Sequence, residues 1–169
     1  NRIKKKVKQN YIPYLHNGAT SQDAIDTAII LQIKDSKSLL INSLKNISLK
    51  LFKLAEKNTN TLTVARTRNK IATVTTFAFK VSNWLLPIVR NLERLKKVYD
   101  DNLYIQLGGP TGNLVSFNNK GIKVKKRMSY LLGLSFDEFS WHNQRDRIIE
   151  LCNNLALITG SIGKIAIDL

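Results

Sequence analysis

Cysteine, proline and glycine are all scarce in this chain of 169 residues. The single cysteine, Cys152, excludes a disulfide framework within the chain and a zinc site built from several thiolates. No apolar run approaches the length of a membrane-spanning helix, and the basic residues 1–9 lack the apolar core of a signal peptide. We therefore expect a cytoplasmic protein that does not insert into a membrane.

Acidic residues are also few, with 12 Asp and Glu against 27 Lys and Arg, so the formal net charge is +15. Such an excess favours anionic partners, which include nucleic acid, an acidic membrane surface and acidic substrates. The charge is weak support for nucleic acid, because AT-biased coding also enriches lysine and asparagine and because no nucleic-acid-binding motif is recognisable. A hydrophobic share of 43% and a charged share of 23% indicate a folded domain with a core.

Strand-type alternation of apolar and polar residues is not found over any useful length. Apolar residues instead recur every three or four positions, which is typical of helices packed in a bundle. We predict an all-α fold of long helices. The first expected helix covers residues 21 to about 57. The second follows residues 62–67 and ends near residue 100. A shorter third helix covers about residues 119–132, and the last helix opens at residues 141–147. Gly133 is predicted to cap the third helix, whose lysines are expected to face solvent.

Four loop-like segments interrupt these helices, at residues 16–23, 65–70, 106–113 and 141–147. Long helices in a bundle bring such breaks together at shared ends. The segments contain two histidines, several hydroxyls and amides, and arginines, which bind carboxylates through two parallel hydrogen bonds. The pattern predicts a pocket for a polycarboxylate.

The first of these segments has the pattern of a capped helix start. Thr20 and, three residues on, Asp23 match a capping box, and the free backbone N–H groups of such a helix start suit a carboxylate or phosphate. His16, just before the cap, can donate a proton or a hydrogen bond. An ordinary capped helix with a surface histidine is the alternative interpretation.

Residues 16–28 read H-N-G-A-T-S-Q-D-A-I-D-T-A. This string resembles the first signature region of the fumarase/aspartase/adenylosuccinate lyase superfamily, in the form typical of its 3-carboxy-cis,cis-muconate cycloisomerase branch. Residues 65–72, 106–112 and 141–148 resemble three later motifs of the superfamily, in the same order. The closing W-H-x-Q-R-D-R, together with H-x-G-A-T-S-Q-D, favours the cycloisomerase branch over adenylosuccinate lyase.

The resemblance implies the long-helix bundle of the superfamily's central domain and a homotetramer whose active sites lie where subunits meet. It implies no metal and no organic cofactor. The substrate would be a small polycarboxylate diene, which is lactonised when one of its own carboxylates adds to a double bond. His16 and His142 are the implied proton donors. The implied substrate-binding residues are Thr20, Ser21, Arg66, Thr67, Arg145 and, from a second subunit, Gln106.

The chain departs from the family pattern at several positions. Ala65 and Lys70 replace a glycine and a glutamine, and Arg68 stands where the lyases of the superfamily have histidine. The family's mobile G-S-S-x-M-P-x-K-x-N-P loop, which supplies a serine base, and its N-terminal domain are not found in the sequence. We therefore expect residues 1–169 to be a single central helical-bundle region of a longer enzyme, with its N-terminal domain and C-terminal part missing.

Two other interpretations stay open. One is a C–N lyase of the adenylosuccinate lyase type. The other is a non-catalytic basic helical module, or an inactive remnant, that binds nucleic acid or partner helices. The sequence also leaves open which histidine gives the proton and which substrate of the superfamily is used.

Overall fold

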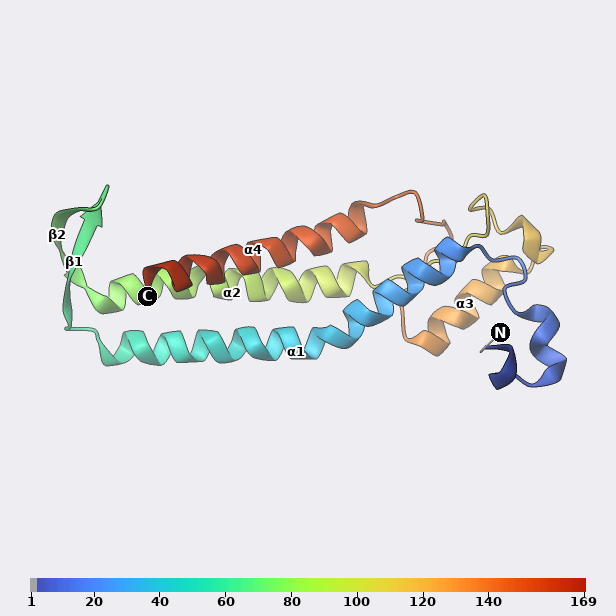
Figure 1. Ribbon diagram of the computed structural model, residues 1–169, viewed down its shortest axis with the longest axis horizontal. Helices are drawn as coiled ribbons and strands as arrows, with labels where there is room; N and C mark the ends of the chain where they lie inside the picture. Colours follow the sequence, from blue (N-terminus) through green and yellow to red (C-terminus); the bar gives the residue numbers. More distant parts are fainter. Residues whose placement is uncertain (1–2) are drawn as a thin grey trace. The chain divides into compact units, whose positions relative to one another are not determined.

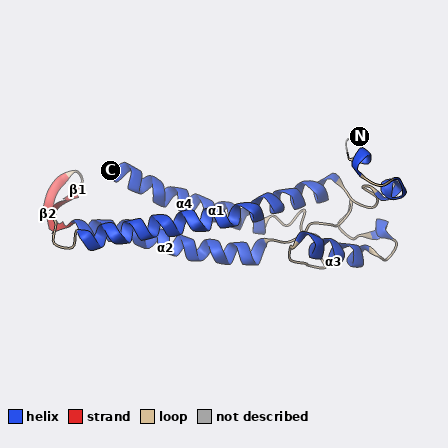
Figure 2. Cartoon of the chain, turned by 90° about the horizontal axis from the view of Figure 1, so that it is seen from below, coloured by secondary structure: helices blue, strands red, loops and turns tan. Residues whose placement is uncertain are grey.

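The structure, a computed structural model, describes residues 3–169, and helices dominate this range (Figure 1, Figure 2). No helix in it is both long and apolar enough to cross a membrane. The elements follow in the order η1 (Lys4–Lys6), η2 (Gln9–Tyr14), α1 (Ser21–Lys57), β1 (Leu62–Thr67), β2 (Lys70–Thr76), α2 (Phe77–Asn102), η3 (Val115–Phe117), α3 (Gly121–Leu132) and α4 (Asp146–Asp168), where η marks a 3-10 helix.

The chain divides into two compact units. The first consists of the residues up to Asp35 together with Asn102–Arg147, and it contains α3. The second consists of Ser36–Asp101 and Ile148–Leu169, and it contains the β-hairpin and nearly all of α2 and α4. Helix α1 therefore begins in the first unit and ends in the second.

Helix α1 begins where the capping pattern predicts. Asp23 Oδ2 accepts a hydrogen bond from the Thr20 backbone N–H at 2.9 Å, which satisfies a donor that the helix itself leaves unpaired. No proline or glycine interrupts Ser21–Lys57, so the helix continues to the polar residues that follow it. Leu44 and Leu51, which are spaced seven residues apart on α1, are buried. The predicted first helix is confirmed.

The β-hairpin differs from the sequence prediction: the expectation that residues 62–67 lead directly into a helix is wrong. β1 and β2 pair in antiparallel fashion, with a shift in register after Ala65. Arg68 and Asn69 form the turn with positive φ angles of 47° and 64°, as in the two-residue turns that suit hairpins. The segment is rich in threonine and valine, which favour strands. Because threonine is polar, its presence on the strands weakens the apolar periodicity that would identify them.

The helices of the second unit pack through apolar side chains. Those buried on α1, α2 and α4 are Leu44, Leu51, Val81, Trp84, Ile88, Leu95, Val98, Tyr99, Leu151 and Ile158. Polar contacts also join α2 to α4. Asn91 Nδ2 donates to Leu157 O at 3.1 Å and to Ser161 Oγ at 2.9 Å. Trp84 Nε1 donates to Asp168 Oδ2 at 2.7 Å. These bonds fix the register of the two helices.

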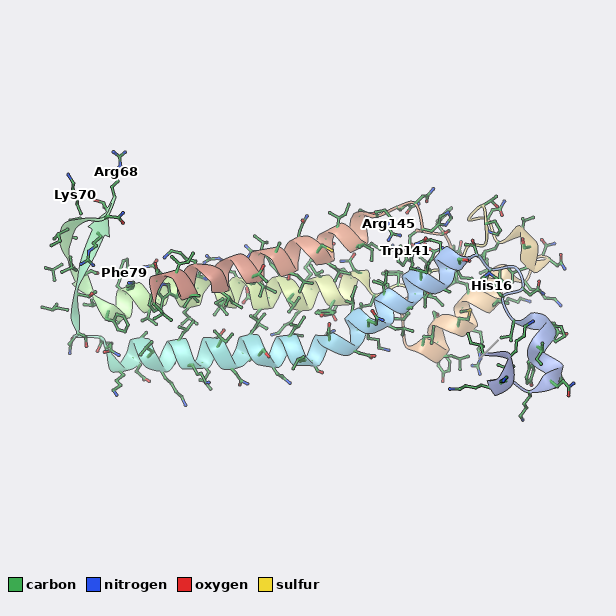
Figure 3. All side chains as sticks on the ribbon, viewed as in Figure 1. His16, Arg68, Lys70, Phe79, Trp141 and Arg145 are labelled. Atoms are coloured by element: carbon green, nitrogen blue, oxygen red, sulfur yellow. The ribbon has the colours of Figure 1, made fainter. Side chains whose placement is uncertain are left out.

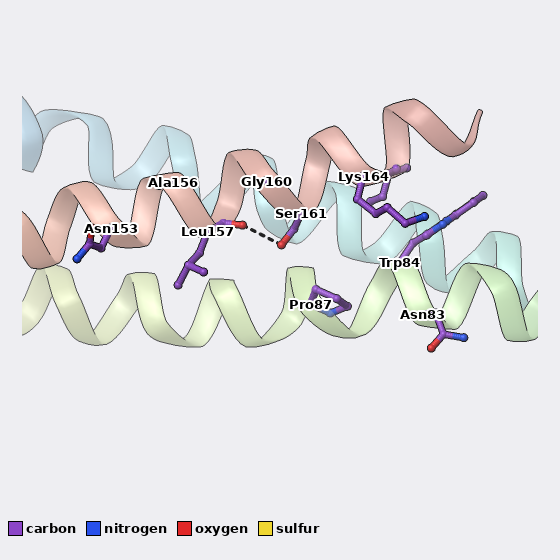
Figure 4. Close-up of a pocket in the computed structure, with 10 residues that line it drawn as sticks. Asn83, Trp84, Pro87, Asn153, Ala156, Leu157, Gly160, Ser161 and Lys164 are labelled. Atoms are coloured by element: carbon purple, nitrogen blue, oxygen red, sulfur yellow. Dashed lines mark hydrogen bonds between the residues drawn. The ribbon is translucent and has the colours of Figure 1, made fainter. Parts of the chain in front are cut away.

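A groove of about 630 Å³ lies between α2 and α4 (Figure 4). Trp84 and Pro87 line it from α2, and Ala156 and Gly160 line it from α4. A Cβ atom added at Gly160 would meet no atom within 4 Å, so the groove is open beside this glycine. None of the residues predicted for the active site lines the groove.

The last two predicted helices are both present, and each begins later in the chain than expected. Helix α3 ends at Gly133, whose φ of 59° lies in the left-handed region that favours glycine at a helix end. Helix α4 begins at Asp146, not at Trp141. The Trp141 backbone N–H donates instead to Gln106 Oε1 at 2.8 Å, so this part of the chain belongs to a loop.

We predict that Ile88→Ala lowers the free energy of unfolding by about 2–5 kcal/mol, because it removes a large aliphatic side chain that is fully buried on α2. Leu86→Ala is the matched control, since it truncates a side chain of the same size on the same helix that is 53% exposed. Its cost should stay within about 0.5 kcal/mol. Urea unfolding followed by circular dichroism measures both, and equal losses would contradict the assigned buried face.

Candidate functional site

Three of the four loop segments that were predicted to meet lie in the first unit. They are residues 16–23, 106–113 and 141–147, which come from three separate parts of the sequence. Figure 3 shows His16, Trp141 and Arg145 on these segments. Hydrogen bonds of the Asp23 and Gln106 side chains join these three segments, whereas residues 65–70 belong to the second unit. That all four segments form one pocket stays a prediction.

Asp23 is the centre of these contacts. Its side chain is 3% exposed, and its carboxylate accepts four hydrogen bonds from N–H groups. Oδ1 accepts from Gln106 Nε2 and from the Gly108 backbone, both at 2.8 Å. Oδ2 accepts from the backbone N–H groups of Thr20 and Gly109, both at 2.9 Å. Since a buried carboxylate needs such donors, Asp23 ties the glycine-rich loop to the start of α1.

Gln106 extends the contacts to the third loop. Its side chain is 1% exposed, and Oε1 accepts the Trp141 backbone N–H at 2.8 Å. Nε2 donates to Ser140 Oγ at 2.7 Å as well as to Asp23. The backbone N–H of Gln106 donates to Thr27 Oγ1 at 3.1 Å, and its carbonyl accepts from that hydroxyl at 2.8 Å. Its role as a substrate ligand stays a prediction.

Ser140 connects this network to His142. Ser140 Oγ lies 2.6 Å from His142 Nδ1, and Gln106 Nε2 lies 3.5 Å from the same nitrogen. Ser140 is buried and His142 is half-buried. Sequence reasoning selected His142 and missed Ser140, because a lone serine before the W-H-x-Q-R-D-R string carries no signal of its own.

Glycines allow the loops to approach one another closely. Gly109 has a φ of 72°, and a Cβ atom there would lie 2.7 Å from the carbonyl oxygen of Gly18. A Cβ atom at Gly108 would lie 2.4 Å from Ser140 Oγ, and one at Gly112 would lie 3.0 Å from His142 Cε1. Side chains at these positions would therefore displace the serine and the imidazole.

Arg145 is held by a buried carboxylate. Its NH1 and NH2 groups donate to the two oxygens of Asp26 at 2.8 Å and 3.1 Å, and Asp26 is fully buried. The hydrogen bond with Asp26 raises the pKa of Arg145 above its ordinary value. The guanidinium also lies over the Trp141 ring, 5.5 Å from its centre. Arg145 was predicted to bind substrate, and that role stays a prediction.

The remaining predicted residues of the first loop lie at its surface. His16 is exposed and has a φ of 61°, Thr20 is half-buried and Ser21 is exposed. Within residues 3–169, neither histidine belongs to a group of three or more His, Cys, Asp and Glu side chains that could hold a metal ion. The roles predicted for His16 as a proton donor and for Thr20 and Ser21 as substrate ligands stay predictions.

Arg66 and Thr67 are not among the residues that the structure brings together in the first unit. Both lie at the end of β1 in the second unit, next to the hairpin turn, and both are exposed. Within residues 3–169, Arg66 makes no ion pair within 4 Å. Their predicted contact with substrate stays a prediction.

Lys125 corrects the expectation that all lysines of α3 face solvent. Its side chain is fully buried, and Nζ donates to the Phe139 carbonyl at 2.6 Å, one residue before Ser140. Burial lowers the pKa of Lys125 below its ordinary value of 10.5, while the charges of Asp137 and Asp23 oppose that change. The sequence pattern does not distinguish Lys125 from the exposed basic residues of the same helix, because these residues lie within two helical turns of one another.

Arg147 supports the same segment from the start of α4. It pairs with Asp137 at 2.9 Å, and its guanidinium lies 3.9 Å from the centre of the Tyr104 ring. The hydrogen bond from Arg147 holds the pKa of Asp137 below its ordinary value. Arg147 is therefore a structural ion-pair partner here.

A family comparison bears on what these loops do. The sequence matches, over residues 2–169, a protein family that is described as Lyase. The chain belongs to this lyase family. The chain spans about a third of the length of the curated relatives that it matches.

Relatives within the lyase family have different names. N-acetyl-S-(2-succino)cysteine lyase of Dickeya dadantii is 34% identical over 156 residues, which are 92% of this chain and 34% of the relative. 3-Carboxy-cis,cis-muconate cycloisomerase of Pseudomonas aeruginosa is 35% identical over 155 residues, with the same shares of 92% and 34%. The predicted resemblance to the cycloisomerase branch is confirmed.

A solved structure of the lyase family gives the fold. The beta-carboxy-cis,cis-muconate cycloisomerase of Acinetobacter calcoaceticus is 33% identical and superposes with a TM-score of 0.93. The match covers 99% of this chain and 39% of that one. The predicted fold class, the long-helix bundle of the fumarase/aspartase superfamily, is confirmed, with the hairpin as an addition to an otherwise helical chain.

We predict that Asp26→Asn lowers the free energy of unfolding by about 1–3 kcal/mol, because it removes the charge that pairs with Arg145. The loss stays below that of a fully buried pair, since the Arg145 side chain is 37% exposed. Asp100→Asn is the matched control. It breaks the exposed Lys37–Asp100 pair and should leave the urea midpoint unchanged. A midpoint that falls as far for Asp100→Asn as for Asp26→Asn would contradict the difference in burial.

We predict that the burial of Lys125 makes stability depend on pH below 10.5. Because its pKa is lower in the folded than in the unfolded chain, the unfolded chain binds more protons in this window. The free energy of unfolding therefore gains a contribution as pH rises toward 10.5 and loses it as pH falls. Lys125→Met should flatten this rise in urea unfolding measured between about pH 7 and pH 10. Lys126→Met, at an exposed neighbour, should keep the wild-type slope. Parallel curves for Lys125→Met and wild type would refute the assignment.

Proposed function

We propose that the full-length protein is a cycloisomerase that closes a lactone in a tricarboxylic diene, as a cytoplasmic enzyme without a metal or organic cofactor. The observation that carries the proposal is the convergence of three polar loops on the Asp23–Gln106–Ser140–His142 network. The names of the cycloisomerase relatives support the same reaction. In this reaction a substrate carboxylate oxygen bonds to one alkene carbon, and the π electrons take up a proton at the adjacent carbon.

His142 is the proposed general acid. One ring nitrogen, Nδ1, is engaged by Ser140, whereas no hydrogen bond of Nε2 is found among residues 3–169. The half-buried ring therefore has one anchored edge and one edge that is available to a substrate carbon. A positioned general acid of this kind contributes about 10²–10⁴-fold to rate. His16 is the second candidate for the same role.

The start of α1 is the proposed carboxylate site. Thr20 and Ser21 carry hydroxyls there, and the positive end of the helix dipole favours a negative charge. The Asp23 carboxylate uses the Thr20 backbone N–H, so a substrate would bind the hydroxyls and the N–H groups that follow. Asp23 is then a permanent part of the structure, whereas the substrate carboxylate binds beside it and is released.

Arg66 and Thr67 are proposed to reach the substrate from another subunit of a homotetramer. Their hairpin is exposed, and Arg66 has a guanidinium without an ion pair among residues 3–169. Arg145, in contrast, has its guanidinium bound to Asp26, so it suits a supporting role. A polycarboxylate needs cations that are free to pair with it. Gln106 is likewise proposed to hold the loops in position.

Elimination is the second candidate reaction. The N-acetyl-S-(2-succino)cysteine lyase relative is about as similar to this chain as the cycloisomerases are. An adenylosuccinate lyase-type reaction belongs to the same class, since both would release a group beside a carboxylate. The proposed network serves either reaction, because both require a bound polycarboxylate and a proton donor.

We predict that the natural full-length protein consumes 3-carboxy-cis,cis-muconate with loss of diene absorbance and formation of a lactone. His142→Asn should lower kcat/KM by about 10²–10⁴-fold, the range for a general acid. His16→Asn is measured beside it, and the histidine whose loss has the larger effect on kcat is the proton donor. Urea unfolding of each variant controls for loss of the fold.

Other outcomes of this assay are decisive. Cleavage of adenylosuccinate or of N-acetyl-S-(2-succino)cysteine, without turnover of the diene, would replace the cycloisomerase proposal by elimination. Binding to random-sequence duplex DNA that weakens steeply with salt, without turnover of any of these substrates, would favour the basic-module interpretation.

A further inference from the structure

A chain of buried hydrogen bonds ends on His142. It runs from the Asp23 carboxylate through Gln106 Nε2 and Ser140 Oγ to His142 Nδ1, with separations of 2.8, 2.7 and 2.6 Å. Asp23, Gln106 and Ser140 are all at most 9% exposed. Because water has little access to these groups, each hydrogen in the chain must be placed by the groups themselves.

The orientation of the Gln106 amide is fixed from both sides. Oε1 faces the Trp141 backbone N–H, which can only donate. Nε2 faces Asp23, which accepts three backbone N–H groups and so acts as an acceptor. A reversed amide would set donor against donor at one end and acceptor against acceptor at the other. Nε2 therefore donates to Ser140 Oγ.

The direction of the last bond follows from that of the previous one. Ser140 Oγ accepts the hydrogen of Gln106 Nε2, so its own hydrogen needs another acceptor. Among the described residues, the one group in hydrogen-bond contact with Ser140 Oγ besides Gln106 is His142 Nδ1. Nδ1 must then be unprotonated, and a neutral imidazole carries its hydrogen on Nε2.

We infer that Ser140 is a positioning residue that holds His142 as the tautomer with its hydrogen on Nε2. The backbone N–H groups that bind Asp23 set this tautomer through three intervening side chains. The glycines beside the imidazole and the serine leave both side chains the space that this arrangement needs.

The consequence for the reaction rests on the proposed function. If His142 is the general acid, it transfers the proton from Nε2 of the doubly protonated ring, because a neutral ring that lost its Nε2 hydrogen would be left as an imidazolate. The resting ring takes up the second proton at Nδ1, and the Ser140 hydroxyl then turns its own hydrogen away and accepts that of Nδ1. Ser140→Ala should lower kcat by about 10–100-fold with little change in KM, the range found when the partner that orients a metal-bound histidine is removed.

The tautomer can be measured without any substrate. The chain has two histidines, so ¹⁵N-histidine labelling gives few signals, and His16→Gln assigns those of His142. Spectra are recorded near pH 8, above the ordinary histidine pKa of about 6.5. We expect a protonated-type shift for Nε2 and an unprotonated-type shift for Nδ1. In Ser140→Ala both shifts should move toward the averaged values of free imidazole, while Ser116→Ala, which removes an exposed hydroxyl of the same unit, should change neither.

The outcomes separate this inference from the proposed function. A protonated Nδ1 in the wild-type chain would overturn the inference, whether or not the variant folds and whether or not the enzyme turns over. Wild-type shifts that persist in a folded Ser140→Ala chain would overturn the role of Ser140. An Nε2–H tautomer that depends on Ser140, in a protein that converts none of the tested substrates, would support the inference and refute the proposed function.

Discussion

The burial of the Asp23 carboxylate is the interaction on which the first unit depends. A carboxylate that is 3% exposed is costly unless several donors surround it, and here four N–H groups do so. Three of these donors are backbone groups from two separate segments. The carboxylate thus caps α1 and at the same time closes the glycine-rich loop onto it. The histidine and arginine of the third loop are arranged around this fixed centre.

Much of this arrangement follows from the sequence. The capping pattern at Thr20 and Asp23 locates the start of α1, and Gly133 locates the end of α3. Convergence of the loops follows from the resemblance to a family in which these motifs share a site. The hairpin was not foreseen, because the threonines of its two short strands resemble polar loop residues. Lys125 and Ser140 were missed because their burial depends on how segments that are distant in the chain pack together.

The burial of two acidic residues adds to the positive character of the surface. Asp23 and Asp26 are both buried, and their carboxylates accept hydrogen bonds from the loops that contain Gly109 and Arg145. Buried aspartates do not neutralise lysines and arginines at the surface. Since this chain has 12 acidic and 27 basic residues, its surface is positively charged. Such an exterior attracts anionic ligands in general.

Gln106 has a property that neither a carboxylate nor a hydroxyl shares: one end of its amide only accepts and the other only donates. A row of hydroxyls can reverse all its hydrogens together, whereas a row that contains an amide has a polarity set by covalent structure. Exchange of this one side chain for glutamate would place two acids face to face and make the polarity depend on a shared proton. Because the amide lies between an acid and a serine, it fixes which atom donates and which accepts in each hydrogen bond of the row. The tautomer of the imidazole at the end of the row follows from these directions.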